Sequence, residues 1–408
     1  MKLYRGLVGG TVEALQHIFV RNRQADRVVE QILKSNKKWG ARDRAFIAEN
    51  TYEMVRWWRL VKYAADMPKA SDAQDFWHLI GVWQLIKPLH LSTEPVELLP
   101  EWPEFSAIDP IRVKERYVEG LQTRKVAQSV PDWIDEIGEK ELGEKWGPEL
   151  VALNKTAPLT LRVNTLKTDI AAVREILGSE NTEMVSGVPE AITLKKRQNV
   201  GSNEAFKNGL FEVQDAGSQL IAPFLDIRPG MSVIDACAGA GGKSLHISAL
   251  LQNTGSVLAM DIEDHKLTEL VKRAHRNGVT NLQTMLIDSE DSIKSLSETA
   301  DRVLLDVPCS GLGVLRRNPD SKWKLKPEFL NSIRNVQGQI LSTYCRMVKK
   351  GGKLVYATCS ILPSESEDQV QLFLKENVKK WKLVSEHRTS VAHDGFDGFY
   401  MALLERKR

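Results

Sequence analysis

The stretch MSVIDACAGAGGKSLHISALLQ, residues 231–252, decides the fold class of this chain. It begins with a short apolar run typical of a buried strand, turns at three glycines, and continues with apolar residues at helical spacing. A strand, a glycine-rich turn and a helix in this order are typical of the first unit of a parallel α/β sheet. In such sheets a ligand binds where the strand ends and the helix begins.

The alternation of strand and helix continues toward the end of the chain. Further strands are predicted at 255–261, 282–288, 301–306 and 353–358, with helical stretches between most of them. A last strand is predicted at 398–406, on the edge of the sheet. Residues 213–408 are therefore expected to form a doubly wound, mostly parallel, Rossmann-like sheet of the α/β class.

The rest of the chain divides into two regions. Residues 1–128 show apolar residues at helical spacing, which predicts a helical domain. Residues 129–212 open with two short helical patterns, continue with strands and a helix, and are expected to form a small α/β module. Six of the ten tryptophans fall in the first region, where we expect them to fill the core: Trp39, Trp57, Trp58, Trp77, Trp83 and Trp102.

The composition is that of a folded protein with more than one domain, because the chain has 408 residues, 42% of them hydrophobic and 27% charged. No segment approaches the roughly 20 apolar residues of a membrane span. The N-terminus lacks a signal-peptide core, so a cytoplasmic location is expected. Four scattered cysteines without a Cys-x-x-Cys pair argue against a disulfide framework and a structural zinc site. The net charge of +3 permits a polyanionic partner, and we expect a monomer.

Carboxylates and thiols follow the predicted strands where they end. Because the carboxyl ends of parallel strands share one edge of a sheet, we expect these side chains to line one active site. A single aspartate at such a place would more often cap a helix or a turn, but a series at successive strand ends favours a site. The residues are Asp235, Asp261, Asp288, Asp306, Cys309 and Cys359.

The glycine-rich turn fits neither of two common nucleotide motifs. A P-loop needs a glycine where Cys237 stands, and a dinucleotide fingerprint needs one where Ser244 stands. A tight turn followed by Asp261, about twenty residues on, suits an adenosine ligand without a pyrophosphate, which favours S-adenosylmethionine. Asp288 is then expected near the adenine edge. The loop comprises Cys237, Ala238, Gly239, Ala240, Gly241, Gly242 and Lys243.

Two thiols beside a methyl donor indicate a specific chemistry. The C5 atom of cytosine or uracil is a poor nucleophile, and a thiolate that attacks C6 makes C5 electron-rich enough to accept a methyl group. Asp306 could hydrogen-bond the ring N3 and the amino group of cytosine. Either thiol alone would more often be a buried small side chain, and the spacing leaves open which of Cys309 and Cys359 attacks.

The run LRRNPDSKWKLK, residues 315–326, follows Cys309 closely. Basic side chains around a tryptophan predict a surface that contacts RNA phosphates and stacks on a base. The alternative is a solvated charged loop, but the position beside the predicted site favours the RNA surface. The residues concerned are Arg316, Arg317, Lys322, Trp323, Lys324 and Lys326.

Four motifs resemble, in order, those of the Sun/Fmu family of RNA cytosine-C5 methyltransferases: DACAGAGGKS, AMDIEDHKL, DRVLLDVPCSGLGVLRRNPDSKWK and LVYATCSILPSESE. The segments LRVNTLK and FEVQDAGSQLIAP resemble that family's preceding segments, so the resemblance covers about residues 130–408. The stretch RDRAFIAENTYEMVRWW resembles the NusB-type helical domain of the ribosomal RNA members. The turn departs from the usual Cys-Ala-Ala-Pro-Gly-Gly-Lys, because Gly239-Ala240 replaces Ala-Pro.

The resemblance implies a role for each matching residue. Cys359 would be the nucleophile on C6, and Cys309 would assist release of the methylated RNA. The loop 237–243, with Asp261, Asp288 and Asp306, would hold S-adenosylmethionine and place the target base. The helical domain and the α/β module would then bind RNA.

The leading hypothesis is therefore an enzyme that makes 5-methylcytosine, in ribosomal RNA of the small subunit (16S). Methylation of transfer RNA is the alternative substrate, and DNA is possible in principle. A noncatalytic RNA-binding assembly factor is a second hypothesis, but both thiols and Asp306 are present. Methylation of an exocyclic nitrogen is disfavoured, because DVPCSG does not fit the Asn/Asp-Pro-Pro-aromatic stretch of those enzymes.

Overall fold

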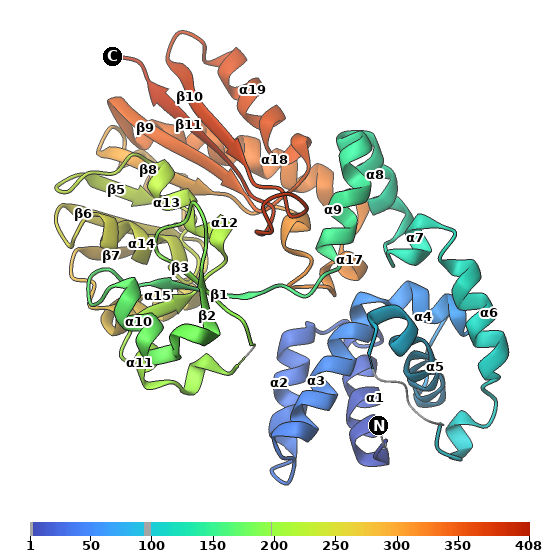
Figure 1. Ribbon diagram of the computed structural model, residues 1–408. Coiled ribbons are helices and arrows are strands. Elements are labelled where there is room, and N and C mark those ends of the chain that lie inside the picture. The colour runs from blue at the N-terminus through green and yellow to red at the C-terminus, as the bar shows by residue number, and fades with distance from the viewer. Residues whose placement is uncertain (1–2, 94–98, 197) are drawn as a thin grey trace. The chain divides into compact units, whose positions relative to one another are not determined.

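A computed structural model describes residues 3–93, 99–196 and 198–408 (Figure 1). The chain forms two compact units. The helical unit comprises Met1–Asn154 and Leu315–Leu325, and the sheet unit comprises Lys155–Val314 and Lys326–Arg408. Among the described residues, no helix is both long and apolar enough to cross a membrane.

The helical unit confirms the helices predicted in residues 1–128. Its core consists of apolar side chains repeated at helical spacing on α1, α3, α4 and α5, with Trp57, Trp58 and Trp83 buried among them. Trp39, Trp77 and Trp102 pack against this core while half-buried. The helices are α1 (Arg5–Phe19), α2 (Ala25–Ser35), α3 (Ala41–Arg56), α4 (Trp58–Ala64), α5 (Ala73–Leu91), α6 (Pro110–Gly120), α7 (Arg124–Ala127), α8 (Asp132–Leu142), α9 (Trp146–Leu153) and, from the inserted segment, α17 (Ser321–Lys324).

The sheet unit is built on a seven-stranded sheet in the order β10-β11-β9-β8-β5-β6-β7. The five predicted strands before residue 398 are confirmed, and they run parallel to one another. The two strands that follow them in the chain are antiparallel. The strands are β5 (Ser232–Asp235), β6 (Ser256–Asp261), β7 (Leu282–Leu286), β8 (Ala300–Asp306), β9 (Val348–Thr358), β10 (Trp381–Arg388) and β11 (Tyr400–Arg406).

The predicted position of the last strand is wrong. β11 lies between β9 and β10, so the edge of the sheet is β10, a strand that the sequence analysis does not predict. The burial of the two strands explains the order, because Tyr400–Leu404 are all buried, as an inner strand covered on both faces requires. The side chains of β10 are mostly exposed.

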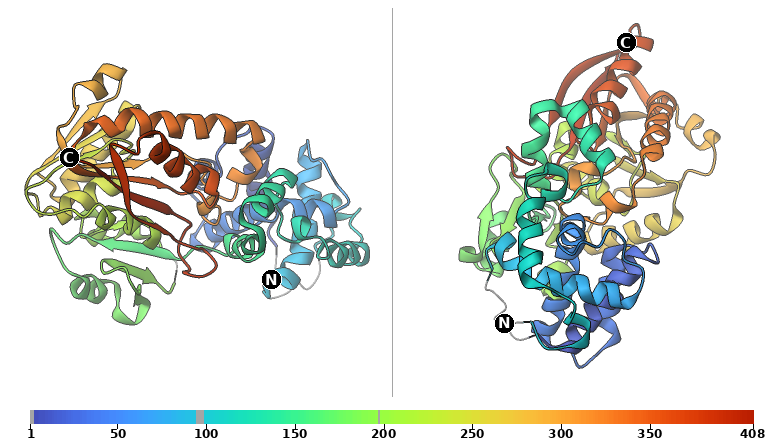
Figure 2. Two further views of the ribbon diagram at one scale, coloured as in Figure 1. Left: turned by 90° about the horizontal axis from the view of Figure 1, so that it is seen from above. Right: turned by 90° about the vertical axis from the view of Figure 1, so that its right-hand side faces the viewer.

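Helices cover both faces of this sheet (Figures 1 and 2). Alternate strand residues point to opposite faces: Leu304 packs with α13 and α14, while Val303 and Leu305 pack with α16, α18 and α19. This is the doubly wound arrangement that the sequence predicts. The helices that follow the small sheet in the chain and belong to this unit are α12 (Ala216–Gln219), α13 (Ile221–Phe224), α14 (Gly242–Leu250), α15 (Asp264–Asn277), α16 (Glu290–Lys294), α18 (Pro327–Tyr344) and α19 (Glu367–Glu376).

A second, four-stranded antiparallel sheet of order β2-β3-β1-β4 belongs to the same unit. Its core is formed with α10 and α11. The two helices α8 and α9, which the sequence analysis assigns to the α/β module, group with the helical unit. The division into 1–128, 129–212 and 213–408 thus stays a prediction. The elements of the module are β1 (Leu159–Val163), α10 (Ile170–Leu177), β2 (Thr182–Met184), β3 (Ala191–Leu194), α11 (Glu204–Lys207) and β4 (Phe211–Val213).

Candidate active site

The parallel strands carry the predicted residues to one edge of the sheet. Asp235, Asp261 and Asp306 are the last residues of β5, β6 and β8. Cys359 directly follows β9, and Cys309 is three residues beyond β8. Since β8 and β9 are neighbours in the sheet, the two thiol loops begin side by side.

The glycine-rich loop forms a tight turn before α14. Gly239 and Gly241 have φ of +55° and +88°, in the left-handed region that favours glycine. The Gly241 amide donates to the Ala238 carbonyl at 2.9 Å, which closes the turn. A Cβ atom on Gly241 would meet Leu270 at 2.5 Å, whereas the space beside Gly239 is open to 4 Å. The chain can therefore accept a ligand close to the backbone at Gly239.

Asp261 links this turn to the next strand. One oxygen of its buried carboxylate accepts the Gly239 amide at 2.8 Å, and the other accepts the Glu263 amide at 3.0 Å. Asp288 is exposed and accepts the hydroxyls of Ser292 and Ser289, which lowers the pKa of its carboxyl. A fixed carboxylate therefore ends β6, and an accessible one lies just beyond β7.

Asp306 forms an ion pair with Lys243, the last residue of the glycine loop. Both side chains are mostly buried. Burial lowers the pKa of Lys243, but the charges of Asp306, Cys359 and Asp235 outweigh burial and raise it above the ordinary value. Lys243 is therefore an ammonium ion at neutral pH, within electrostatic reach of the Cys359 sulfur.

The sulfur atoms of Cys309 and Cys359 are 3.2 Å apart. The hydrogen bond with Cys359, together with burial, raises the pKa of Cys309 well above the ordinary value. Cys309 therefore stays protonated at neutral pH. Cys237 and Cys345 pack against the core of the sheet unit while half-buried.

Two buried residues of the site are missed by the sequence analysis. Glu365 is completely buried and accepts hydrogen bonds from both thiol loops. The acidic residues after Cys359 resemble a helix start, and that pattern conceals the role of Glu365. Arg162 of β1 is buried and donates to the Gly242 carbonyl at 2.6 Å, so the small sheet supports the start of α14.

The prediction for the basic run is wrong in part. Lys322 is buried in the helical unit, and its Nζ donates to the Arg56 carbonyl at 2.7 Å and to Asn154 Oδ1 at 3.2 Å. Trp323 packs against the helical core, and its Nε1 donates to the Val55 carbonyl at 2.7 Å. Lys322 is therefore not free to contact RNA as predicted. Trp323 is half-buried and lines a pocket with Arg59 and Lys62, so its contact with RNA stays a prediction.

The two arginines of this run differ in burial. The side chain of Arg316 is also buried, so it does not form the predicted exposed phosphate surface. Arg317 is half-buried, and a contact from Arg317 to RNA stays a prediction.

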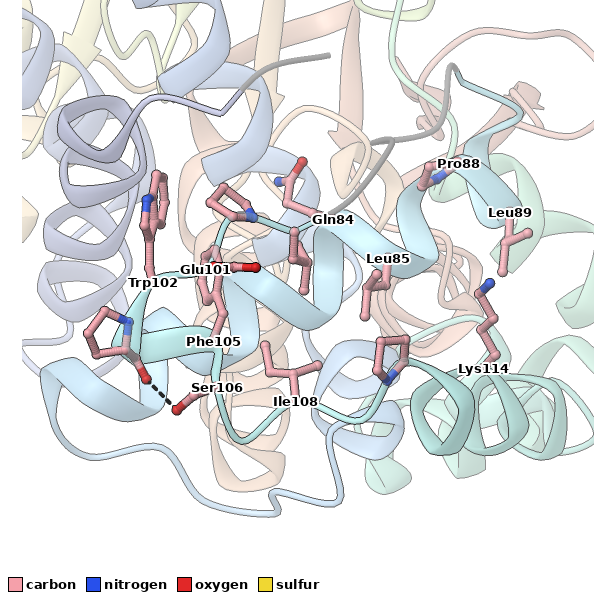
Figure 3. A pocket seen from close by; sticks show the side chains of 14 residues that line it. Gln84, Leu85, Pro88, Leu89, Glu101, Trp102, Phe105, Ser106, Ile108 and Lys114 are labelled. Atoms are coloured by element: carbon pink, nitrogen blue, oxygen red, sulfur yellow. Dashed lines mark hydrogen bonds between the residues drawn. The ribbon is translucent and has the colours of Figure 1, made fainter.

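The helical unit also contains a pocket of about 640 Å³ (Figure 3). Leu85, Phe105 and Ile108 give it an apolar wall from α5 and the segment before α6. The pocket shares no residue with the groups at the strand ends.

Comparison with known proteins agrees with this geometry. Residues 222–405 match the family model of 16S rRNA methyltransferase RsmB/F, and residues 130–201 match the ferredoxin-like domain of RsmF/B-like methyltransferases. The chain is 31% identical over 395 residues to ribosomal RNA small subunit methyltransferase B of Vibrio vulnificus, covering 90% of this chain and 92% of the relative. It is 35% identical over 326 residues to the probable methyltransferase B of Bacillus subtilis, covering 75% and 70%.

The chain belongs to the RsmB/F family of ribosomal RNA methyltransferases. Two solved structures share the fold of this RsmB/F protein. The crystal structure of PH0851 has a TM-score of 0.83 at 23% identity and covers 99% of both chains. NSun6 from Pyrococcus horikoshii with SFG has a TM-score of 0.63 at 19% identity and covers 68% of this chain and 98% of its own.

The RsmB/F protein is an S-adenosylmethionine-dependent methyltransferase, and the residues at the strand ends fit that cofactor. The open space beside Gly239 admits a ligand to the backbone. The Asp261 carboxylate contacts the Gly239 amide, and Asp288 is an exposed carboxylate just beyond β7. The assignment of individual residues to parts of the cofactor stays a prediction.

Proposed function

We propose that this RsmB/F enzyme methylates C5 of a cytosine in small-subunit ribosomal RNA. The observation that carries the proposal is the pair of thiols 3.2 Å apart, beside the Lys243–Asp306 ion pair. A methyl transfer to an amine or a hydroxyl needs no thiol, whereas methylation of a pyrimidine carbon needs a covalent nucleophile. The names of the relatives from Vibrio vulnificus and Bacillus subtilis favour ribosomal RNA as the substrate.

Cys359 is the proposed nucleophile. Its thiolate attacks C6 of the cytosine, which forms the S–C6 bond and makes C5 electron-rich. Bound S-adenosylmethionine would supply the electrophilic methyl group to C5 and would leave as S-adenosylhomocysteine, whose sulfur keeps the electron pair of the broken S–CH₃ bond. After the methyl has joined C5, the C5 proton leaves to a base, the S–C6 bond breaks, and the electron pair of that bond returns to the sulfur. The ammonium of Lys243 supplies positive charge beside that sulfur.

Cys309 and Asp306 are proposed to serve the same cycle from β8. The protonated thiol of Cys309 lies against the Cys359 sulfur and can donate to it when the S–C6 bond breaks. Asp306 is proposed to accept from the cytosine amino group while Lys243 balances its charge. The loop 237–243, Asp261 and Asp288 are proposed to hold the cofactor.

The test is bisulfite sequencing of total RNA from cells with and without the gene. The expected result is one cytosine of the small-subunit RNA that loses protection when the gene is deleted. Loss of protection at a cytosine of a transfer RNA would support the C5 methylation but make transfer RNA the substrate. If no cytosine changed and the purified protein transferred no label from S-adenosylmethionine, the proposal would be wrong and the protein would be a noncatalytic RNA-binding assembly factor.

The RNA-binding parts are proposed to be the helical domain and the small α/β module, with Arg317 as a further contact. We propose that the protein works in the cytoplasm as a monomer. Crosslinking of the purified protein to RNA, followed by mass spectrometry, would locate the contacts, and light scattering would give the oligomeric state. Crosslinks confined to the sheet unit would overturn an RNA-binding role for the helical domain.

A further inference from the structure

Glu365 is a buried carboxylate that joins the two thiol loops. It is the last residue of a short helical turn, Pro363–Glu365, after Cys359. Its Oε2 accepts the Ser310 amide at 2.8 Å, and its Oε1 accepts the Ser360 hydroxyl at 2.6 Å. Ser310 directly follows Cys309, and Ser360 directly follows Cys359. One side chain therefore fixes the residue next to each sulfur.

Within the described residues, two further groups donate to the Glu365 carboxylate. The Ser310 hydroxyl donates to Oε1 at 2.5 Å, and Gln337 Nε2 of α18 donates to Oε2 at 3.1 Å. A carboxylate without exposed surface is costly unless each oxygen is well hydrogen-bonded. Four donors on two oxygens meet that need, and they form a site built for a group that only accepts.

Backbone hydrogen bonds also hold the two loops. The Gly313 amide donates to the Cys359 carbonyl at 3.0 Å, and the Gly398 amide donates to the Gly313 carbonyl at 2.8 Å. A Cβ on Gly313 would meet the Gly398 oxygen at 2.0 Å, so this layer is tightly packed. The Glu365 side chain adds hydrogen bonds to both loops, from Ser310 and from Ser360.

We propose that Glu365 is a positioning residue that holds the Cys309 and Cys359 sulfurs at their working distance. The proposal rests on the proposed function, because the distance matters only if both thiols act on one base. Glu365 itself lies beneath the loops and is fully buried, so it acts through Ser310 and Ser360. A displacement of about 1 Å at a reacting group can cost on the order of 100-fold in rate.

The test compares Glu365→Gln with wild-type enzyme on a matching RNA. An amide presents one acceptor and one NH₂ group, so the donors on one side of the side chain lose their acceptor and the loops shift. We expect kcat to fall by at least about 10-fold, while the KM and the dissociation constant for S-adenosylmethionine stay within about threefold. The control is Glu376→Gln, an exposed carboxylate at the end of α19, which should leave all three values unchanged.

Two serine variants separate the loops. Ser360→Ala should slow formation of the covalent protein–RNA adduct, because it loosens the nucleophile. Ser310→Ala should let the adduct form and accumulate, because it loosens the thiol that assists release. The adduct is measured on a denaturing gel. These variants also test the proposal if Glu365→Gln does not fold.

The outcomes distinguish this inference from the proposed function. If wild-type enzyme transfers no methyl group, the proposed function fails. If wild-type enzyme is active and Glu365→Gln turns over normally, the positioning role is wrong. A Glu365→Gln protein that binds S-adenosylmethionine poorly and loses thermal stability to the same extent would show a purely structural role, and equal adduct levels in both serine variants would also overturn the inference.

Discussion

The sulfur atoms of Cys309 and Cys359 lie 3.2 Å apart, at the ends of two neighbouring parallel strands. The register of β8 and β9 places Asp306 beside Ala357, so the two loops leave the sheet at the same level. The Gly313 amide and the Glu365 carboxylate then hold them together. The hydrogen bond with Cys359 and burial raise the pKa of the Cys309 thiol well above its ordinary value, which disfavours a thiolate at Cys309.

Cys359→Ala should abolish methyl transfer, because the covalent route to C5 needs a thiolate at C6. Binding of S-adenosylmethionine should stay within about threefold of wild type, since the cofactor loop lies on other strands. Turnover with labelled cofactor and isothermal calorimetry measure the two effects. Cys345→Ala is the control and should be fully active, because Cys345 lies before β9 begins, whereas Cys359 follows the end of that strand. Normal turnover of Cys359→Ala would show that the assignment of Cys359 as the nucleophile is wrong.

Cys309→Ala should permit attack of Cys359 on the cytosine C6 atom and block release of the methylated RNA. The expected product is a protein–RNA adduct that survives a denaturing gel. The Cys359 nucleophile is still present in this variant, but the thiol that would donate a proton to its sulfur is gone. The double variant Cys309→Ala with Cys359→Ala should form no adduct. An adduct in that double variant, or free turnover of Cys309→Ala, would contradict the assigned division of labour.

The strand ends of the site could be predicted from sequence because a parallel sheet brings them to one edge. Asp261 and Asp306 each end a run of apolar residues, and that local pattern is sufficient to place them. The proximity of the thiols follows from the adjacency of β8 and β9, which is usual for this fold. The order of attack does not follow from spacing, and it comes from the family resemblance.

What could not be predicted depends on distant partners. Lys322 lies in a run whose pattern predicts a basic surface for RNA, but the Arg56 carbonyl at the end of α3, 266 residues earlier in the chain, accepts from its ammonium. The last carbonyls of a helix have no partner within the helix, so they attract a lysine. The role of Glu365 also depends on a residue far away in the sequence, because its partner Ser310 lies 55 residues earlier in the chain. The edge strand β10 was missed because most of its side chains are exposed, which removes the apolar signal.

Asp235→Asn should change how stability depends on pH. Burial raises the pKa of Asp235 to about 6, whereas an exposed aspartate titrates near 4. The folded state therefore holds this proton more tightly than the unfolded state, and Asp235 costs stability as pH rises from about 4 to about 6. At roughly 1.4 kcal/mol per pKa unit, the cost approaches 3 kcal/mol above pH 6.

Urea unfolding at a series of pH values measures this effect. The free energy of unfolding of Asp235→Asn minus that of wild type should rise between pH 4 and about pH 6 and stay constant above that pH. Asn can still accept from the Ser244 hydroxyl, which bonds to Asp235 at 2.6 Å. Asp264→Asn, at an exposed position, is the control. A difference that is flat across the whole range would show that Asp235 is ionised in the folded state as easily as in water.

Trp323→Ala should destabilise the helical unit, although the residue lies between the two thiols in the sequence. Its ring packs against the helical core, and its Nε1 donates to the Val55 carbonyl near the end of α3. Loss of a half-buried tryptophan should cost about 2 kcal/mol, and Trp323→Phe, which loses mainly the hydrogen bond, about 1 kcal/mol. Hydrogen exchange should rise across α3 while the strands of the sheet unit stay protected. The exposed Lys326→Ala is the control. Weaker RNA binding with unchanged exchange in α3 would instead restore the stacking role predicted from the sequence.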